Sequence, residues 1–529
     1  MGASMSAILL TIHKKYAAYT VGKQSFTWLL LICAASASLI HFNAIPVGSF
    51  FDDAHYIVLA ESLSSGRGYH LINYPTAPVE TAFPPGWPLL LTPVVKLLPG
   101  NFIALKMVAF LFWLASIPLI YRLGTKILDS PYLEAAMLLI VLNPHLAGMS
   151  STVMSESAYL FFSLLTVCLL LAWEQKQGGQ RTGLLIAALA TAVCTLLIRT
   201  IGIALLAALF VYLLVNGRRR NILIVAVLSL LALLPLAWFN QQNGGAIFFS
   251  PSYKVHFEYV MVRLVEMSRI WEHIAIVPPE AVANTVLPIL DLGGVTTVLS
   301  SAGTRFVGLV ILLLIFSGYL LSLKKHPLPA FYISFYLVIF YLWSVYIEQV
   351  QLRILLPLIP FLAFYMMQAI VQAAKTITRH NQQKTTPIIL GIAAFILSAN
   401  MARHAHNWYS PIRDRVVDLS IGNAWLQQNA PDEAIIMSAN PVPDYLYSRR
   451  QTAPYPAEGI ALNQHIAEIG VDFVLVRPLL QDWHNPDKNL SPYAKEILLP
   501  FLNNHPEQFE KVYWQSAHNV SVFKVLTTP

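Results

Sequence analysis

Long apolar runs constrain this chain more than any other feature. Mainly apolar stretches of about 20 residues recur between residues 26 and 402, and a helix of that length crosses the hydrocarbon core of a bilayer. Of the 529 residues, 56% are hydrophobic and only 12% are charged, whereas a soluble domain carries about a quarter charged residues. We therefore predict a polytopic α-helical membrane protein. About eleven spans are expected, at 26–47, 101–122, 131–149, 154–173, 183–199, 201–217, 221–240, 304–323, 328–347, 353–373 and 386–402.

The basic residues predict the orientation of these spans. If the N-terminus is cytoplasmic, then Lys14, Lys15 and Lys23 are inside and every second loop after them is basic, as the positive-inside rule requires. The loops 48–100 and 241–303 then face outward. The net charge of +7 is explained by topology rather than by nucleic-acid binding. We expect a multi-pass protein of a bacterial inner membrane, with membrane lipids but no nucleic acid among its partners.

The composition changes after residue 402, where the chain becomes polar. We expect residues 1–402 to form the transmembrane module and residues 403–529 to form a small α/β domain on the outer, periplasmic face. Amphipathic patterns predict helices at 415–429 and 493–504. Alternating apolar residues predict strands at 433–439, 471–477, 511–517 and 520–525.

Two adjacent carboxylates, Asp52 and Asp53, follow the first span in the segment Phe-Phe-Asp-Asp-Ala-His-Tyr. They open a predicted helix that ends at Gly66 and lies along the membrane interface. Aspartates at this position can cap the helix and complement its dipole. Two carboxylates at the mouth of a membrane span can also provide a general base and a metal ligand.

Three more charged residues lie at the outer ends of predicted spans. Glu156 begins the span at 154–173, Arg199 ends the span at 183–199, and Arg353 begins the span at 353–373. Glu156 can serve as a complement to the helix dipole, and the two arginines can snorkel to the interface. Alternatively, the guanidinium groups can bind a lipid phosphate, because their planar fork matches phosphate oxygens.

Several of these segments resemble those of the GT-C glycosyltransferases. Asp-Asp-Ala-His-Tyr after the first span resembles the acidic motif of glycosyltransferase family 39, which includes protein O-mannosyltransferases and lipid A aminoarabinose transferases. The segment 81–93, with Pro84 and Pro85, resembles the family's Pro-Pro segment, which closes the first outer loop. The resemblance covers roughly residues 26–373. It implies a GT-C fold with interfacial helices in the first outer loop and a small outer domain.

The resemblance also implies a function and a set of site residues. Enzymes of this family take a sugar from a polyprenyl-phosphate carrier on the outer face and pass it to an acceptor, which is a lipid, a glycan or a protein. By resemblance, the catalytic acids are Asp52, Asp53 and Glu156. The residues that bind the donor phosphate are, by the same resemblance, Arg353 and Arg199.

The cofactor and the rival functions stay open at this point. Some family members use a metal and others do not, so a divalent cation is a candidate cofactor, with Asp53, Glu156, His55 and His256 as candidate ligands. The alternatives are a transporter or flippase of lipid-linked sugars, an oligosaccharide ligase or polymerase, and a non-catalytic scaffold. Transporters tend to place charges near the bilayer midplane between repeated halves. The charges here gather at one face instead, which favours the transferase.

Overall fold

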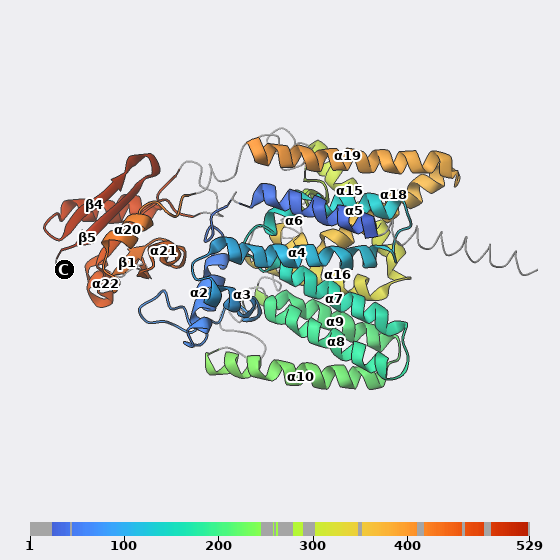
Figure 1. Cartoon of the computed structure of the whole chain (residues 1–529), viewed down its shortest axis with the longest axis horizontal. Coiled ribbons are helices and arrows are strands. Elements are labelled where there is room, and N and C mark those ends of the chain that lie inside the picture. The colour runs from blue at the N-terminus through green and yellow to red at the C-terminus, as the bar shows by residue number, and fades with distance from the viewer. Residues whose placement is uncertain are drawn as a thin grey trace, which may run out of the picture.

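The computed structural model consists of a long helical bundle and a small sheet domain at one end of it (Figure 1). It describes residues 24–42, 45–244, 258, 261–262, 279–288, 302–347, 352–409, 417–456, 461–480 and 488–526. Most of the predicted outer loop 241–303, with the metal candidate His256, lies outside the described residues.

The bundle confirms the prediction of a polytopic helical protein. Within the described residues, eight helices are long and apolar enough to cross a membrane, while the apolar helices at 132–141, 200–215 and 327–342 are shorter. The long axes of the bundle helices run along the molecule (Figure 1). These helices are Gln24–His41, α4 (Phe102–Gly124), α7 (Glu156–Glu174), α8 (Gly178–Ile198), α9 (Ile203–Val215), α10 (Arg219–Gln242), α15 (Ala302–Leu323), α16 (Pro327–Ile347), α18 (Ile359–Ile377) and α19 (Gln382–Tyr409).

Three of the predicted spans differ in detail from the structure. The first ends at His41 rather than at residue 47. The span predicted at 131–149 consists of two helices, α5 (Tyr132–Val141) and α6 (Pro144–Met149). They separate because the Asn143 side chain caps α6 by accepting from the backbone N–H of His145 and of Leu146, at 3.0 and 3.3 Å.

The span predicted at 353–373 also begins with an interruption. It starts as the single turn α17 (Leu352–Leu355) and the 3-10 turn η3 (Leu356–Leu358), and then continues as α18. Pro357 lies in the 3-10 turn, and a proline removes a backbone donor and disfavours a regular helix at the preceding turn.

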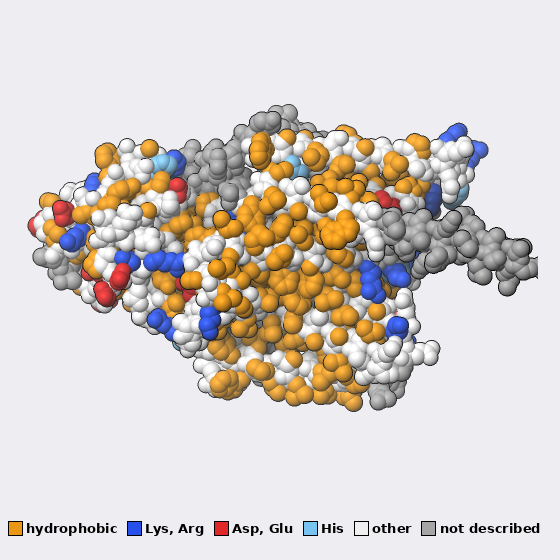
Figure 2. All heavy atoms as spheres, viewed as in Figure 1, with side chains coloured by type: hydrophobic (Ala, Val, Ile, Leu, Met, Phe, Trp, Pro, Cys, Tyr) orange, Lys and Arg blue, Asp and Glu red, His pale blue; other side chains and the backbone are white. Residues whose placement is uncertain are grey.

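The helices differ greatly in how much protein covers them. The apolar window of α18 is 94% buried, and this helix packs against α15 and α5. The corresponding window of α10 is only 6% buried. Hydrophobic side chains cover the visible face of the bundle, and Lys and Arg gather toward the two ends of the molecule (Figure 2). This is the surface expected of a protein that faces lipid along its sides and water at both ends.

The segment predicted as the first outer loop folds at the end of the bundle that faces the sheet domain (Figure 1). It contains α2 (Asp52–Ser64), as predicted, and α3 (Gly86–Leu97), and the two pack against each other. The apolar face of α2 buries Tyr56, Leu59 and Ala60.

The C-terminal domain contains a five-stranded sheet in the order β2-β1-β3-β5-β4. β1 pairs in parallel with β2 and β3, while β5 pairs antiparallel with β3 and β4. The strands are β1 (Ile435–Ser438), β2 (Gln451–Pro454), β3 (Phe473–Val476), β4 (Phe509–Gln515) and β5 (Val520–Val525).

Four of these strands match the predicted strands, whereas β2 was not predicted. The helices of the domain are α20 (Asn423–Asn429), α21 (Pro441–Ser448), α22 (Leu462–Ile469) and, after a π-helical turn at Ala494–Leu498, α23 (Leu499–Asn504). The helix predicted at 415–429 begins only at Asn423, because Gly422 before it has a positive φ of 81°. Helices α21 and α22 were missed.

Candidate active site

A strained turn precedes the two aspartates of α2. The Asp52 backbone N–H donates to the Phe50 carbonyl at 2.6 Å, and Phe51 between them has φ 59° and ψ −53°. This is a γ-turn, a conformation that costs free energy for a side chain as large as phenylalanine. No side chain caps α2 in the described structure, so capping does not account for the aspartates. A strained backbone such as that of Phe51 persists only where contacts with the surrounding structure stabilise it.

Asp52 forms an ion pair with Arg353. The distance from its Oδ2 to Nη1 of Arg353 is 2.7 Å, and each side chain is 23% exposed. Arg353 lies on α17, the isolated turn before α18. A carboxylate at the start of the first outer loop thus meets a guanidinium from a segment 301 residues later in the chain.

Glu156 forms a second ion pair, with Arg199. Oε1 of Glu156 lies 2.7 Å from Nη1 of Arg199, which also donates to the Ser155 hydroxyl at 3.1 Å. Glu156 opens α7, and Arg199 follows the last residue of α8 in an extended conformation. The glutamate is only 3% exposed. Its second oxygen, Oε2, is buried and has no hydrogen-bond partner among the described residues.

The two ion pairs belong to one electrostatic cluster, which Tyr56 joins. The Tyr56 hydroxyl lies 3.4 Å from the Ser155 hydroxyl. Burial and then the negative charge of Asp52 raise the pKa of Tyr56, and Arg199 and Glu156 also act on it. Arg353 in turn interacts with Glu156 and Arg199 as well as with Asp52. The structure therefore brings four of the predicted site residues together from four separate segments.

Asp53 lies in a different environment from Asp52. Its side chain is 1% exposed, and its carboxylate accepts hydrogen bonds from the backbone N–H groups of Gly48, Phe50 and Ala54 at 2.7, 3.2 and 3.1 Å. Burial raises the pKa of Asp53 to about 6, although the hydrogen bond from Gly48 opposes this effect. Asp53 therefore holds the loop before α2 in place.

The Pro-Pro segment positions α3 close to Arg199. Pro85 directly precedes α3, and Gly86 opens it. Gly86 lies so close to the end of α8 that a Cβ atom added to it would be 2.6 Å from the Leu197 carbonyl oxygen. Trp87 then donates its indole N–H to the Val153 carbonyl at 3.1 Å. Pro84 and Pro85 thus end the loop where the helix must approach the α8 backbone.

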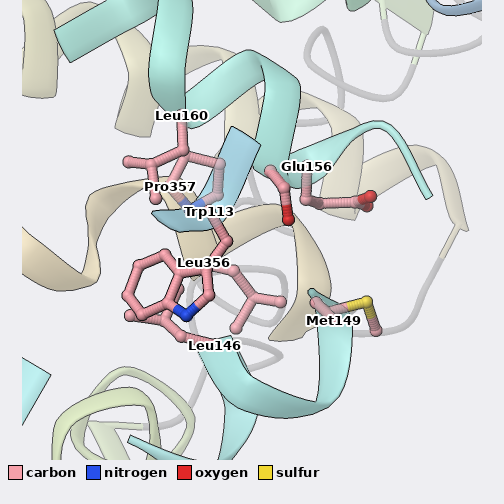
Figure 3. A pocket seen from close by; sticks show the side chains of 8 residues that line it. Trp113, Leu146, Met149, Glu156, Leu160, Leu356 and Pro357 are labelled. Atoms are coloured by element: carbon pink, nitrogen blue, oxygen red, sulfur yellow. The ribbon is translucent and has the colours of Figure 1, made fainter. Parts of the chain in front are cut away.

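An apolar cavity adjoins Glu156. Figure 3 shows the Trp113 indole on one side of the space and the Glu156 side chain on the other, extending away from the indole. Helices α4, α6 and α7 and the η3 turn after Arg353 all contribute to the lining, so the cavity lies between the segment that carries Glu156 and the turn that follows Arg353. Its lining consists of Trp113, Leu146, Met149, Glu156, Ser157, Leu160, Leu356 and Pro357.

The candidate metal ligands do not form a ligand set in the part of the chain that the structure describes. No group of three or more His, Cys, Asp or Glu residues there could hold a metal ion. Asp53 is hydrogen-bonded to its own loop, and Glu156 is paired with Arg199. His55 contacts the Phe51 carbonyl through Nδ1 at 2.9 Å and packs on the Phe83 ring.

Sequence reasoning missed three residues of the site. Tyr56 lies four residues after Asp52, so the helical spacing could have placed it on the same face. Ser155 precedes Glu156 and could have been inferred from its position in the chain. Tyr336, on α16, donates its hydroxyl to the Ile354 carbonyl at 2.5 Å, directly after Arg353. No local pattern marks that tyrosine.

Comparisons with known proteins reveal the fold. No protein-family model matches the chain, and no curated protein matches it in sequence. Among solved structures, it is similar to ArnT from Cupriavidus metallidurans in the apo state, with a TM-score of 0.56 and 13% identity over 95% of this chain and 98% of that chain. The same protein bound to undecaprenyl phosphate gives a TM-score of 0.55 and 12% identity over 94% and 98%.

A second set of similar structures is archaeal. The Archaeoglobus fulgidus oligosaccharyltransferase, in complex with Zn and sulfate, has a TM-score of 0.55 and 16% identity over 84% of this chain and 67% of that chain. These proteins and ArnT are GT-C glycosyltransferases. The described helical bundle with its C-terminal sheet domain therefore has the GT-C fold, as the sequence predicted.

Proposed function

We propose that this protein is a membrane glycosyltransferase that moves a sugar from a polyprenyl-phosphate donor to an acceptor on the outer face of the membrane. The observation that carries the proposal is the cluster of the Asp52–Arg353 and Glu156–Arg199 pairs at the bundle end next to the sheet domain. The solved structures support the donor class, since ArnT is bound to undecaprenyl phosphate and the A. fulgidus enzyme AglB to a dolichol-phosphate.

Donor binding is expected to change the partner of Arg353. The donor phosphate presents several oxygens to the guanidinium fork, which binds phosphate in a bidentate manner. Arg353 is partly exposed and already compensated by Asp52, so the phosphate can take the position of that carboxylate. This exchange places a cation on the leaving group and frees Asp52 to accept a proton.

The transfer itself then needs one bond to form and one to break. The acceptor hydroxyl or amine attacks the anomeric carbon from the side opposite the phosphate and gives its proton to Asp52. The bond from the anomeric carbon to the phosphate oxygen breaks, and the phosphate leaves with the electron pair. Arg353, with Arg199 near it, stabilises the negative charge that grows on the phosphate. The anomeric configuration is inverted.

The other acidic residues support this step. Glu156 holds Arg199 in place by its buried ion pair, and its Oε2, which has no hydrogen-bond partner among the described residues, can accept a hydrogen bond from the acceptor. Asp53 positions the loop that carries Asp52. A divalent cation is bound in a structure of the A. fulgidus enzyme, which is complexed with Zn. Among the candidate ligands in the described residues, Asp53 accepts from backbone N–H groups of its own loop, Glu156 pairs with Arg199, and His55 contacts the Phe51 carbonyl.

The location of the site supports the proposed orientation. Positive loops favour a cytoplasmic N-terminus, and the site lies beside the sheet domain (Figure 1). We therefore place residues 1–402 as the transmembrane module in a bacterial inner membrane and residues 403–529 as a periplasmic domain.

The test uses the purified protein in detergent with polyprenyl-phosphate sugars and envelope lipids. A transferase forms glycosylated product without two compartments, whereas a transporter cannot. We expect Asp52→Asn to insert normally and to bind donor at least as tightly as the wild type, but to turn over about 100- to 10,000-fold more slowly, as for loss of a general base. The control is Asp432→Asn, which removes an exposed carboxylate of the sheet domain. Turnover of Asp52→Asn near the wild-type rate would remove Asp52 from the mechanism.

A further inference from the structure

The segment 45–51 joins the first membrane helix to α2, and we call it the 45–51 loop. It ends in the γ-turn at Phe51, which delivers Asp52 to Arg353. Because a strained turn persists only where its surroundings hold it, the contacts of this loop determine where the Asp52 carboxylate lies.

Two of these contacts come from the membrane module. Lys106, on α4, is buried and donates from Nζ to the Ile45 carbonyl at 2.9 Å. Asp53 accepts from the N–H groups of Gly48 and Phe50. The loop is therefore fixed at its start by α4 and near its end by the first turn of α2.

The third contact comes from the C-terminal domain. Tyr447, on α21, donates its hydroxyl to the Val47 carbonyl at 2.7 Å. Its ring packs on Phe102 at the start of α4, with 5.3 Å between the ring centroids. At the next residue of the loop, Gly48 has φ +96° and lies against the domain, since an added Cβ would be 3.2 Å from the Pro443 Cβ. The C-terminal domain thus contacts the middle of the loop at two consecutive residues, Val47 and Gly48.

We propose that Tyr447 is a positioning residue for Asp52, so that the C-terminal domain takes part in catalysis by fixing the 45–51 loop. The inference rests on the proposed function for its catalytic consequence. The Val47 carbonyl, which accepts from Tyr447, and the Gly48 N–H, which donates to Asp53, belong to the same peptide group. Without the tyrosine hydroxyl, this peptide group loses one of its two hydrogen bonds and the loop can shift. A small misplacement of a reacting group is costly in rate.

The domain has other attachments that do not involve Tyr447. Arg449 pairs with Glu61 on α2 at 2.7 Å. The Thr452 backbone N–H donates to the Asn73 carbonyl at 2.7 Å, and the Asn73 amide donates to the Thr452 hydroxyl at 3.2 Å. Removal of one hydroxyl at Tyr447 is therefore expected to leave the domain docked, which makes the substitution a selective test.

The test compares Tyr447→Phe with Tyr455→Phe. The first keeps the ring on Phe102 and loses only the bond to Val47. The second, in the same domain, loses a hydroxyl bond to the Leu475 carbonyl that lies within the domain. Hydrogen exchange of the peptide 45–55 reports on the loop, and kcat and the donor KM report on the reaction. We expect Tyr447→Phe to speed exchange and to lower kcat about two- to tenfold, the range for one neutral hydrogen bond, with KM unchanged.

A third measurement separates an effect of Tyr447 on the position of Asp52 from a general loss of activity. In the Asp52→Asn background, Tyr447→Phe is expected to lower kcat no further, because residues that act as a unit are not additive. A further loss there, or the same losses in Tyr455→Phe, would overturn the inference. So would unchanged exchange in Tyr447→Phe. If the wild-type protein transfers no sugar, the proposed function fails, and the exchange of 45–55 still decides whether Tyr447 holds the loop.

Discussion

Replacing Glu156 with glutamine is expected to destabilise the protein strongly. The substitution keeps the shape of the side chain but leaves the Arg199 cation without its counter-charge. Removing one partner of a buried ion pair costs about 3–5 kcal/mol. Arg199 retains 16% of its exposure and a hydrogen bond to Ser155, so we expect a value near the lower limit, about 3 kcal/mol in the free energy of unfolding.

A double-mutant cycle measures how much of this cost belongs to the pair. Arg199→Gln leaves a buried carboxylate, which can take up a proton and so reduce its own penalty. The double variant Glu156→Gln/Arg199→Gln leaves neither charge alone. Its loss of stability is therefore expected to be clearly smaller than the sum of the two single losses. The assay is denaturant-induced unfolding in detergent micelles, followed by intrinsic fluorescence.

The same variants test whether Arg199 can reach the donor. A polyprenyl phosphate offers an anion in place of the missing carboxylate, so it should stabilise Glu156→Gln more than the wild type. The matched control is the polyprenol without phosphate. Wild-type stability of Glu156→Gln, or strict additivity in the cycle, would refute the view that these two side chains form a coupled buried pair.

The remaining predictions concern Tyr336 and Asp53. Tyr336→Phe removes the hydroxyl bond to Ile354 beside Arg353 and is expected to lower kcat about two- to tenfold. The control Tyr332→Phe loses a bond to the Tyr159 hydroxyl instead; an equal effect of both would contradict a role specific to Arg353. Because burial raises the pKa of Asp53 from 3.8 to about 6, its ionisation costs the folded protein about 3 kcal/mol at neutral pH. The stability that the protonated Asp53 side chain contributes is fully present below about pH 3.8 and is lost as the pH rises through about 6. Thermal melts should therefore show the wild type losing stability relative to Asp53→Asn between pH 4 and pH 6. A difference that does not change with pH would contradict the raised pKa.

The sequence predicted that Asp52, Glu156, Arg199 and Arg353 lie at the same ends of their spans, because the bilayer imposes the lengths and charges of the segments. The structure brings these four side chains together, but the sequence did not predict how they pair. Which arginine meets which carboxylate depends on the packing of helices far apart in the chain. Likewise, Asp52 and Asp53 are adjacent in the sequence, yet the turn at Phe51 gives them different surroundings.

Elements of the C-terminal domain were missed for local reasons. β2 has four residues, lies at the sheet edge and ends in Pro454, so it lacks the alternating pattern that marks a strand. Helix α21 carries Pro441 and Pro443 in its first turn. Two prolines so close together favour a loop prediction, although proline is tolerated in the first turn of a helix.

The break in the span at 131–149 could have been predicted from Asn143 as a helix cap and Pro144 as a first helical residue. The apolar residues on both sides favoured one continuous span instead.

Helix α18 is made late in synthesis and yet lies among its neighbours rather than against lipid. Ribosomes build the chain from its N-terminus, so α5 and α15 are in the bilayer before α18 emerges. With 94% of its apolar window covered by protein, α18 reaches its final place only by exchanging contacts with lipid for contacts with other helices. Arg353 lies just before the N-terminal end of α18. The ion pair between Arg353 and Asp52 therefore joins a segment that is made late in synthesis to one that is made early.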